Sequence, residues 1–295
     1  MKLRNLGDRA ARLVFLANAL LAAVVLLGIL GYLLVYGLRT FTGTSVAGFL
    51  FGGRWNPDAY GEPVYGLVPL LAGSFFTTLI ALAVGIPVGV AGAVFIAERL
   101  KGRFRVVVKT VVELFAGFPS VVLGFFGLVV VAPFISRLFN VPSGLGLLNA
   151  GFILALMSLP TIISVSDDAL RVVPQSYREA AYALGATPWT TAIRVVLPAA
   201  KSGILAAVML GFGRAIGETM AVLMVAGNAA IIPKAIFDPV QTITATIAIE
   251  LGEVPFHTTH FYALFALGLV LFLIALATNL VAESLIRREK KSFTL

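Results

Sequence analysis

The chain has 295 residues, of which 59% are hydrophobic and 12% are charged, and its mean hydropathy is +1.00. Soluble globular chains carry about 25% charged residues, so the composition predicts an integral membrane protein and excludes an ordinary soluble domain. The absence of cysteine excludes disulfides, zinc–thiolate sites and iron–sulfur clusters. The net charge of +8 leaves two explanations for the basic residues, a nucleic-acid partner or membrane topology.

Apolar runs of about 20 residues predict helical membrane spans, and the alternating pattern of barrel strands is absent. We expect about six spans, at residues 13–38, 69–97, 111–139, 150–165, 202–226 and 262–286. The first run is too long for a signal peptide and no cleavage site follows it, so we expect it to be retained. Gly85, Pro87 and Gly89 in the second span, and the segment 117–119 in the third, predict bends or close helix contacts.

The lysines and arginines are segregated between alternate loops. Most of the 22 lie at residues 2–12, 99–109, 171–201 and 287–291, whereas Arg39, Arg54, Arg137 and Lys234 lie on the opposite side. Basic residues accumulate in cytoplasmic loops, so we expect a multi-pass protein of the cell (inner) membrane with both termini in the cytoplasm. Because topology accounts for the positive charge, we expect membrane lipid and no nucleic acid as a partner.

The polar segment 166–201, between the fourth and fifth spans, predicts two short helices at the cytoplasmic surface. Ser176 as N-cap and Glu179 three residues later predict a capping box, and Gly185 is suited to end that helix. Thr187 and Pro188 predict the start of the second helix. We expect Pro198, ten residues further on, to separate that helix from the fifth span.

The first of these helices has a small, apolar surface formed by Ala180, Ala181, Ala183 and Leu184. Such a surface suits docking into a groove of another protein. A helix that rests on lipid or on its own bundle is the alternative, and the capping box alone accounts for Glu179 without any partner.

The spacing of Glu179-Ala180-Ala181, Gly185, Val195 and Leu197-Pro198 resembles the EAA loop of importer-type ABC permeases, with valine where isoleucine is usual. The resemblance implies an all-α integral membrane protein whose coupling helix, here Glu179 to Gly185, sits in a cleft of a nucleotide-binding subunit. The chain has no G-x-x-x-x-G-K-[ST] phosphate loop. We therefore expect a transport subunit rather than an enzyme, with no cofactor of its own and with ATP bound by a separate subunit.

Arg214 lies roughly 18 Å along the predicted fifth span at 1.5 Å per residue, close to the bilayer midplane. A charge there costs about 2.5–3.5 kcal/mol on insertion scales, so it needs a reason. Glu218 follows at i+4, so we expect the two side chains to share a face and pair, with Thr219 beside them. Either the pair only locks helix packing, or the guanidinium receives a tetrahedral oxyanion that the carboxylate helps to position.

The stretch from Gly213 to Val222, GRAIGETMAV, resembles the signature of the phosphate-uptake ABC permeases. It is similar to the PstC-type subunit more than to the PstA-type subunit, because Met-Ala-Val follows Gly-Glu-Thr. The segments 113–122, 55–57 and 66–70 extend the resemblance to about residues 50–290. The family implies that Arg214 and Glu218 belong to the phosphate pathway. It also implies a PstA-type permease, a dimer of PstB-type ATP-binding subunits and a PstS-type phosphate-binding protein as partners.

The resemblance divides the chain into an N-terminal span and outer loop (1–66), an ABC importer transmembrane domain (67–290) and a cytoplasmic tail (291–295). Two other functions stay open. One is an ABC permease for another oxyanion, such as molybdate or sulfate. The other is an ATP-independent secondary anion transporter that uses Arg214 and Glu218 as a proton-linked pair.

Four weaker features complete the sequence-based expectations. Ser120 is assigned to the anion pathway, with a hydroxyl that stabilises the bend at Pro119 as the alternative. We expect Glu113 to pair with Lys109 at i−4, and Asp167 and Asp168 to cap or pair locally. The histidines His257 and His260 stand near Glu250 and Glu253, where we expect solvated side chains and no metal.

Overall fold

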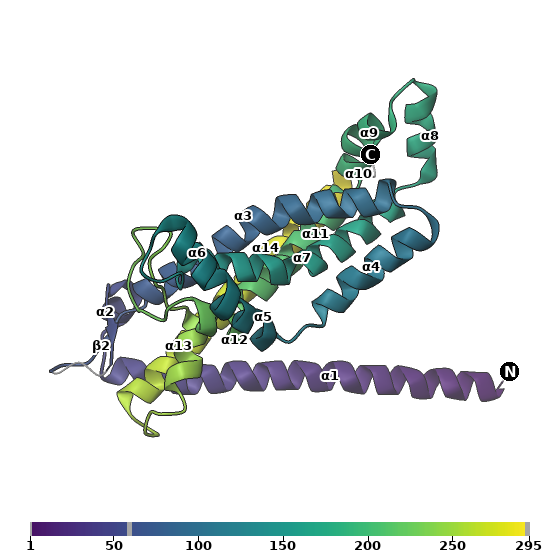
Figure 1. Cartoon of the computed structure of the whole chain (residues 1–295). Coiled ribbons are helices and arrows are strands. Elements are labelled where there is room, and N and C mark those ends of the chain that lie inside the picture. Colours follow the sequence, from purple (N-terminus) through teal and green to yellow (C-terminus); the bar gives the residue numbers. More distant parts are fainter. Residues whose placement is uncertain (1, 58–60, 293–295) are drawn as a thin grey trace.

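The computed structural model describes residues 2–57 and 61–292, and Figure 1 shows long helices packed side by side. Residues 58–60 of the predicted outer loop and 293–295 of the predicted tail lie outside the described residues. The helices and strands are α1 (Lys2–Leu38), α2 (Val46–Phe51), β1 (Trp55–Asn56), β2 (Val64–Tyr65), α3 (Val68–Glu98), α4 (Gly102–Ala116), α5 (Ser120–Phe126), α6 (Ala132–Phe139), α7 (Leu147–Val172), α8 (Gln175–Ala183), α9 (Pro188–Thr191), α10 (Leu197–Ala199), α11 (Lys201–Ile216), α12 (Met220–Val225), α13 (Ile243–Glu250) and α14 (Thr259–Ser292). A 3₁₀ turn follows α1 at Arg39–Thr42, and π-helical turns lie at Gly127–Val131 and Ala192–Val196.

Five segments are long and apolar enough to cross a membrane: Arg12–Thr42, Val68–Glu98, Ser120–Phe139, Leu147–Val172 and Thr259–Ser284. A bent pair of helices, Pro188–Ala199 and Lys201–Ile216, brings the number of candidate spans to six. Among the described residues the only strands are β1 and β2, a hairpin of two residues each in which Trp55 pairs with Tyr65. The predicted all-helical membrane architecture with about six spans is confirmed.

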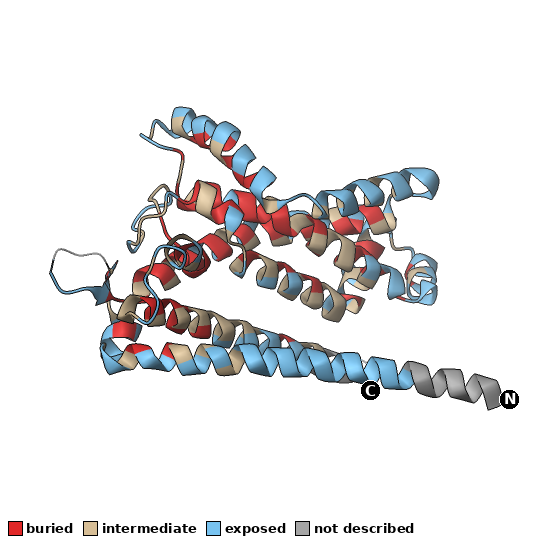
Figure 2. Ribbon diagram, turned by 90° about the horizontal axis from the view of Figure 1, so that it is seen from below, coloured by how far each residue is buried: buried red, intermediate tan, exposed pale blue. Residues whose placement is uncertain are grey.

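α7 lies at the centre of the molecule, where Figure 2 shows buried residues running through the packed helices. Ile153, Leu154 and Ile162 of α7 are fully buried or nearly so. α3 packs along α7 at positions that tolerate only glycine. A Cβ added at Gly89 would lie 2.6 Å from Cγ2 of Ile162, and one added at Gly151 would lie 2.4 Å from Cγ2 of Ile80. Small residues let membrane helices approach this closely, so the predicted close contact at Gly89 is confirmed.

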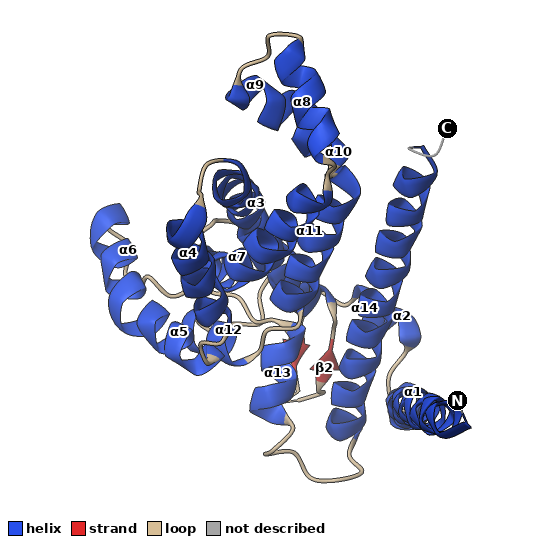
Figure 3. Cartoon of the chain, turned by 90° about the vertical axis from the view of Figure 1, so that its right-hand side faces the viewer, coloured by secondary structure: helices blue, strands red, loops and turns tan. Residues whose placement is uncertain are grey.

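α1 lies at the edge of the molecule, beside α14 (Figure 3). The two helices meet near the end of α1, where Tyr36 contacts Phe265 with ring centroids 5.5 Å apart and Gly37 approaches the backbone of Ala266. In the most apolar 18-residue stretch of the segment Arg12–Thr42, no residue is buried. The exposed apolar surface of α1 is therefore available to lipid or to another membrane chain.

Two predicted span boundaries are wrong for the same physical reason. The fourth span was expected to end at residue 165, but α7 continues to Val172 because Ser166 and Asp167 are buried against the neighbouring helices. The third span was expected to start at residue 111, but the candidate span starts at Ser120, and residues 102–116 form the separate helix α4. In both places polar residues that pair with or pack on another helix lie in a helix where the sequence indicates a loop or a different boundary.

The predicted third and fifth spans are each interrupted. The kink expected at residues 117–119 is a break between α4 and α5. The fifth span, expected to be one helix over residues 202–226, divides into α11 and α12, with residues 217–219 between them. Gly217 ends α11 as its C-cap, with its amide bonded to the carbonyl of Gly213. Glycine is a poor helix residue, which accounts for a break at this position.

Each π-helical turn lies just before a proline. The amide of Ala132 donates to the carbonyl of Gly127 before Pro133, and the amide of Leu197 donates to Ala192 before Pro198. A proline ring clashes with the carbonyl four residues earlier in an α-helix, and the wider turn accommodates it. Pro198 therefore lies within a helix, contrary to expectation. The chain instead turns by 73° where Ala199 is followed by the start of α11.

The two ends of the molecule carry different elements. α8 and α9 project at the end where α3 ends and α4 begins, and the described ends of α1 and α14 point the same way (Figures 1 and 3). The hairpin, α2, α6 and α13 lie at the opposite end. Arg39, Arg54 and Arg137 belong to that opposite end, so the two charge groups of the sequence are separated along the helices.

The glycine contact between α3 and α7 is testable by a matched pair of substitutions in α3. Gly89→Ala should destabilise the protein by about 1–3 kcal/mol, because Ile162 is β-branched and cannot withdraw its Cγ2 by rotation in a helix. Gly92→Ala should be neutral or slightly stabilising, because its Cβ would make ordinary 3.4 Å contacts with Ile163. The thermal unfolding midpoint in detergent measures both variants. Equal midpoints would contradict the tight contact at Gly89.

Candidate functional site

The two interrupted helices meet within the helix bundle. α5 packs against α12 so closely that a Cβ added at Gly124 would lie 2.9 Å from the Cα of Ala221. Gly124 is four residues after the start of α5, and Ala221 is the second residue of α12. The break at 117–119 and the break at 217–219 therefore lie next to one another, and four of the predicted pathway residues flank them.

Arg214 bridges the two breaks. Its Nη2 donates a hydrogen bond to the carbonyl oxygen of Ala116, at 3.3 Å. Ala116 is the last residue of α4, so its carbonyl has no partner within that helix. A cation at a helix C-terminus is also stabilised by the helix dipole. The guanidinium thus satisfies a backbone group that the break would leave unpaired inside the membrane.

Most of the hydrogen-bonding capacity of Arg214 is unused. A guanidinium carries five N–H donors, and among the described residues only the carbonyl of Ala116 accepts from it. The side chain is half-buried. Arg214 lies roughly 20 Å from the start of α11 at 1.5 Å per residue, and its remaining donors are available to acceptors outside the described residues.

Arg214 and Glu218 do not pair, so this prediction is wrong. The helix ends at Ile216, and the i, i+4 geometry does not extend across Gly217. Glu218 instead turns towards α12, where its Oε1 accepts a hydrogen bond from the amide of Ala221 at 3.3 Å. The carbonyl of Glu218 accepts from Oγ1 of the buried Thr244, at 2.8 Å. α13 thereby holds the break in place.

The two predicted hydroxyl groups differ in their surroundings. Oγ1 of Thr219 donates to the carbonyl of Gly217 at 3.4 Å, so it contributes to the break itself. Ser120 is the half-buried first residue of α5, and its hydroxyl makes no hydrogen bond with the described residues. Instead, the amide of Val122 donates to the carbonyl of Pro119 at the bend. The alternative that the Ser120 hydroxyl stabilises the bend is therefore wrong.

Sequence reasoning missed two groups at this site. The carbonyl of Ala116 carries no side-chain signal, and only the Gly-Phe-Pro break after it indicates that its helix ends there. Thr244 stands in the run Gln-Thr-Ile-Thr-Ala-Thr at residues 241–246, whose alternating threonines could have indicated a buried hydrogen-bonding face.

The predicted capping of the surface helix is half right. α8 starts at Gln175 after Pro174, and Ser176 makes no side-chain cap, so the capping box with Glu179 is wrong. The end is as expected: Gly185 adopts φ +80°, and the amides of Gly185 and Ala186 donate to the carbonyls of Tyr182 and Ala181. This pattern of bonds is a Schellman motif.

The second surface helix starts as predicted, since Oγ1 of Thr187 accepts from the amide of Thr190 at 3.2 Å. On the first, α8, the predicted docking residues are exposed apart from one. Glu179, Ala180, Leu184 and Gly185 face outward, with Leu184 90% exposed, and Ala181 is buried against the chain. Without a capping box, the carboxylate of Glu179 has no hydrogen-bond partner among the described residues.

α8 is fixed rigidly to the spans through Arg178. Its guanidinium forms an ion pair with Glu98 at the end of α3, with 2.7 Å between Nη2 and Oε1. It also donates to the carbonyls of Leu170 and Val173 at the end of α7, at 3.0 and 2.9 Å. Arginine and glutamate are both largely buried, 13% and 12% exposed. A displacement of α8 must therefore move the ends of α3 and α7.

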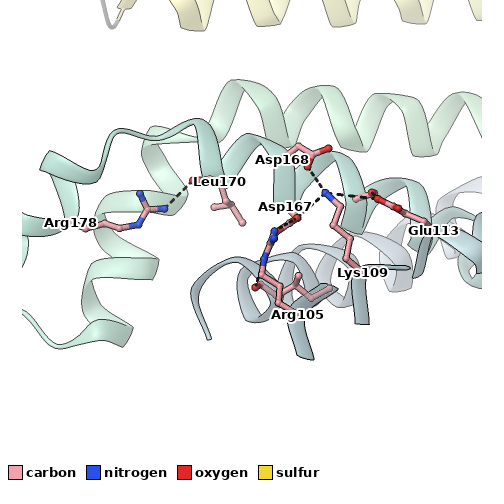
Figure 4. Close-up of polar contacts among 9 residues, drawn as sticks. Arg105, Lys109, Glu113, Asp167, Asp168, Leu170 and Arg178 are labelled. Atoms are coloured by element: carbon pink, nitrogen blue, oxygen red, sulfur yellow. Dashed lines mark hydrogen bonds and ion pairs between the residues drawn. The ribbon is translucent and has the colours of Figure 1, made fainter. Parts of the chain in front are cut away.

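A charge cluster joins α4 to the same end of α7 (Figure 4). Arg105 and Lys109 of α4 pair with Asp167, and Lys109 also pairs with Asp168. The expected local capping or pairing of the two aspartates is wrong, because both pair with residues of another helix. Lys109 also lies 3.9 Å from Glu113, which confirms the predicted i−4 pair.

The outer histidines contact protein groups, and the expectation of a solvated side chain is wrong for His260, which is 13% exposed. Nε2 of His260 lies 2.7 Å from Oε2 of Glu250, and Nε1 of Trp55 donates to the same carboxylate. Nδ1 of His257 lies 3.3 Å from the hydroxyl of Tyr262. No group of three or more potential metal ligands is found within the described part of the chain.

Comparison with known proteins places this geometry in context. The family model described as "Binding-protein-dependent transport system inner membrane component" matches residues 85–291. The chain is 38% identical to a probable ABC transporter permease protein, YqgH, of Bacillus subtilis, over 97% of this chain and 93% of the relative. It is 37% identical to the phosphate transport system permease protein PstC 1 of Mycobacterium tuberculosis, over 98% and 94%.

Solved structures share the fold at low sequence identity. A bacterial ABC transporter involved in the import of alginate matches with a TM-score of 0.63 and 17% identity, covering 96% of this chain and 99% of that chain. The inward-facing MetNI methionine ABC transporter matches with a TM-score of 0.56 and 21% identity, covering 76% and 94%.

The attachment of α8 generates a prediction. Arg178→Gln should lower the hydrogen-exchange protection of residues 175–186 by about tenfold or more, because hydrogen bonds to a charged group contribute about 1.5–3 kcal/mol. Exchange followed by mass spectrometry measures it in detergent. Arg171→Gln, at an exposed arginine near the end of α7, is the control and should leave α8 protected. Unchanged protection in the Arg178 variant would mean that α8 is held by other contacts.

Proposed function

Because the chain belongs to the family of binding-protein-dependent transport system inner membrane components, we propose that it is the PstC-type permease subunit of an ATP-driven phosphate importer. The family makes it a multi-pass transport subunit of an ABC importer and not an enzyme. That membership sets aside the ATP-independent secondary transporter that the sequence alone allowed. The choice among phosphate, sulfate and molybdate as the substrate then depends on the groups around Arg214.

The observation that carries the phosphate proposal is the unused donor capacity of Arg214 beside two helix breaks. A planar guanidinium donates two parallel hydrogen bonds to a tetrahedral oxyanion. Within the described part of the chain, only one of its donors is occupied, at the carbonyl of Ala116. An anion that enters between the breaks would complete the remaining bonds, and in its absence the carbonyl stabilises the charge.

Glu218 supplies a reason for phosphate rather than sulfate. Its Oε1 accepts from the amide of Ala221, and the other carboxylate oxygen has no partner among the described residues. A carboxylate repels a fully deprotonated anion but accepts a hydrogen bond from one that carries a proton, as phosphate does at neutral pH. Thr219 and Ser120 add hydroxyls at the two breaks. The relatives named as PstC subunits support the same substrate.

α8 is proposed as the coupling helix that docks on a PstB-type ATP-binding subunit. Its outward residues Glu179, Ala180, Leu184 and Gly185 form the exposed surface, with Ala181 packed beneath them. A large apolar side chain such as Leu184 gains most when a partner covers it. Because Arg178 ties the helix to α3 and α7, movement of the ATPase would be transmitted to the spans.

We propose that this chain forms half of the translocation pathway and that a PstA-type permease completes it. The Arg214 site is only half-buried within one chain, and the adjacent α4 and α5 expose apolar side chains such as Leu114, Val121 and Phe125. A PstS-type phosphate-binding protein would dock at the opposite end from α8. The excess of basic residues at the α8 end supports a cytoplasmic location for that end and both termini.

The division into residues 1–66, 67–290 and 291–295 remains part of the proposal. The family match at residues 85–291 supports a permease domain over the second of these segments. The first segment carries α1 and the hairpin, which pack on α14 and around the outer end of that domain.

Arg214→Gln should abolish measurable phosphate uptake, a loss of about tenfold or more, because a charge-assisted contact of about 1.5–3 kcal/mol disappears. The measurement is uptake of labelled phosphate by vesicles that contain this chain with its copurifying partners, with and without ATP. Assembly, followed by copurification, should be intact. Arg137→Gln, at an exposed arginine of α6, is the control.

The outcomes separate the competing explanations. Normal uptake in the Arg214 variant would refute its role, and loss of assembly would favour a residue that only locks packing. Competition by excess sulfate or molybdate, tested on the unmodified complex, distinguishes another oxyanion as the substrate.

Gly185→Asp should abolish copurification of the ATPase while the permease still inserts. Aspartate tolerates the positive φ of this position better than most residues, so the end of α8 should survive. The new charge would then oppose docking of the exposed surface. Gly53→Asp, the same change in an open position on the outer loop, should retain the ATPase. Retention in the Gly185 variant would exclude α8 as the docking helix.

A further inference from the structure

The charge cluster at the α8 end of the spans contains one buried acid. Asp167 is 1% exposed, and both of its carboxylate oxygens accept from Nη2 of Arg105, at 2.8 and 2.7 Å. Nζ of Lys109 adds a third contact at 3.0 Å. The adjacent Asp168 is 64% exposed, and among the described residues it pairs only with Lys109. Figure 4 shows Arg105 and Lys109 reaching from α4 to the two aspartates of α7.

α4 has few other attachments. None of its residues is buried, and its apolar side chains Phe104, Val106 and Leu114 are all more than half exposed. Helices within a bundle are normally held by a buried apolar face. In this chain the position of α4 is therefore set largely by polar contacts. Besides the charge cluster and the Arg214 contact, Nε of Arg105 donates to the carbonyl of Ile96 in α3, and Oγ of Ser164 in α7 donates to Glu113, each at 3.3 Å.

At the far end of α4, the last residue, Ala116, contacts Arg214. From Arg105 to Ala116 the helix is continuous, a rigid rod of roughly 17 Å at 1.5 Å per residue. Ala116 at its end accepts the hydrogen bond of Arg214. A shift of the rod at Arg105 must therefore move the carbonyl that Arg214 contacts.

The near end is connected to α8. Leu170 is three residues after Asp167 in α7, and its carbonyl accepts from Arg178 of α8. Energetic coupling between distant sites is carried by rigid elements joined through hydrogen bonds and ion pairs. The described residues contain such a chain without interruption: α8, Arg178, the end of α7, Asp167, Arg105, α4, Ala116 and Arg214.

We propose that Asp167 is a positioning residue that locks α4 to the end of α7, so that movement of α8 shifts Ala116 and changes the hold on Arg214. The inference rests on the proposed function, which it deepens by naming the route between the ATPase and the anion site. Asp167 touches no substrate on this route. Its removal should uncouple ATP hydrolysis from transport rather than stop either assembly or hydrolysis.

The test is the coupling ratio, measured as labelled phosphate taken up per ATP hydrolysed. The assembled transporter is reconstituted in proteoliposomes with ATP inside and the phosphate-loaded binding protein outside. Asp167→Asn should lower the ratio about fivefold or more, the scale of a typical coupling free energy. Asp168→Asn is the matched control and should keep the ratio of the unmodified chain, because that carboxylate is exposed. Asp167→Glu keeps the charge and should restore most of the coupling.

A merely structural role would give a different result. Damaged folding reduces the number of active complexes, so uptake and hydrolysis fall together and the ratio stays constant. An unchanged ratio in Asp167→Asn would overturn the proposal. Where the single variant fails to assemble, Arg105→Gln combined with Asp167→Asn leaves neither charge unpaired, since Lys109 keeps Asp168. That double variant should assemble with a low ratio, and a normal ratio would overturn the proposal.

The failure of the proposed function is distinguishable from the failure of this inference. A reconstituted unmodified complex that hydrolyses ATP but takes up no phosphate would contradict the phosphate assignment. The coupling ratio is then measured with labelled sulfate or molybdate, whichever the unmodified complex imports. A lowered ratio for that anion in Asp167→Asn would still support the positioning role.

Discussion

The hydrogen bond from Arg214 to the carbonyl of Ala116 is the interaction on which the interior of this protein depends. Inside a bilayer there is no water to satisfy backbone groups, so a chain can break its helices only where protein groups take over. α4 ends at Ala116 and α11 ends at Ile216, both inside the runs that the sequence predicts as single spans. The guanidinium of Arg214 in α11 donates to the free carbonyl at the end of α4. The same hydrogen bond thus stabilises the partly buried charge and the unpaired backbone group.

That arrangement also explains why the anion site and the coupling apparatus share a helix. α4 contributes a polar end at each terminus and no buried residue between them. A helix held in this way can shift as a rigid body without opening a cavity in the core, which lies around α7 and α3. α4 is therefore suited to following the end of α7, to which Asp167 joins it, without disturbing the buried contacts between α3 and α7.

Hydropathy and turn residues predicted the spans, the end of α8 at Gly185 and the break at 117–119, because these depend on local properties of the chain. Sequence reasoning failed where a tertiary contact decides. A buried Asp167 and an exposed Asp168 look alike in the sequence. Likewise, the spacing of Arg214 and Glu218 suggested a pair only on the assumption that the helix continues, whereas Gly217 ends it. Pro174, rather than Ser176, is the N-cap of α8.

The π-helical turns before Pro133 and Pro198 have a consequence for the evolution of the chain's length. Each turn holds one residue more than an α-helical turn would. Loss of that residue would rotate the following helical segment by about 100° about its axis. The side chains of α6, or those at the start of α11, would then face different neighbouring helices. We therefore expect insertions and deletions to be tolerated in surface connections such as residues 252–258 and to disrupt the packing of the chain when they fall in either wide turn.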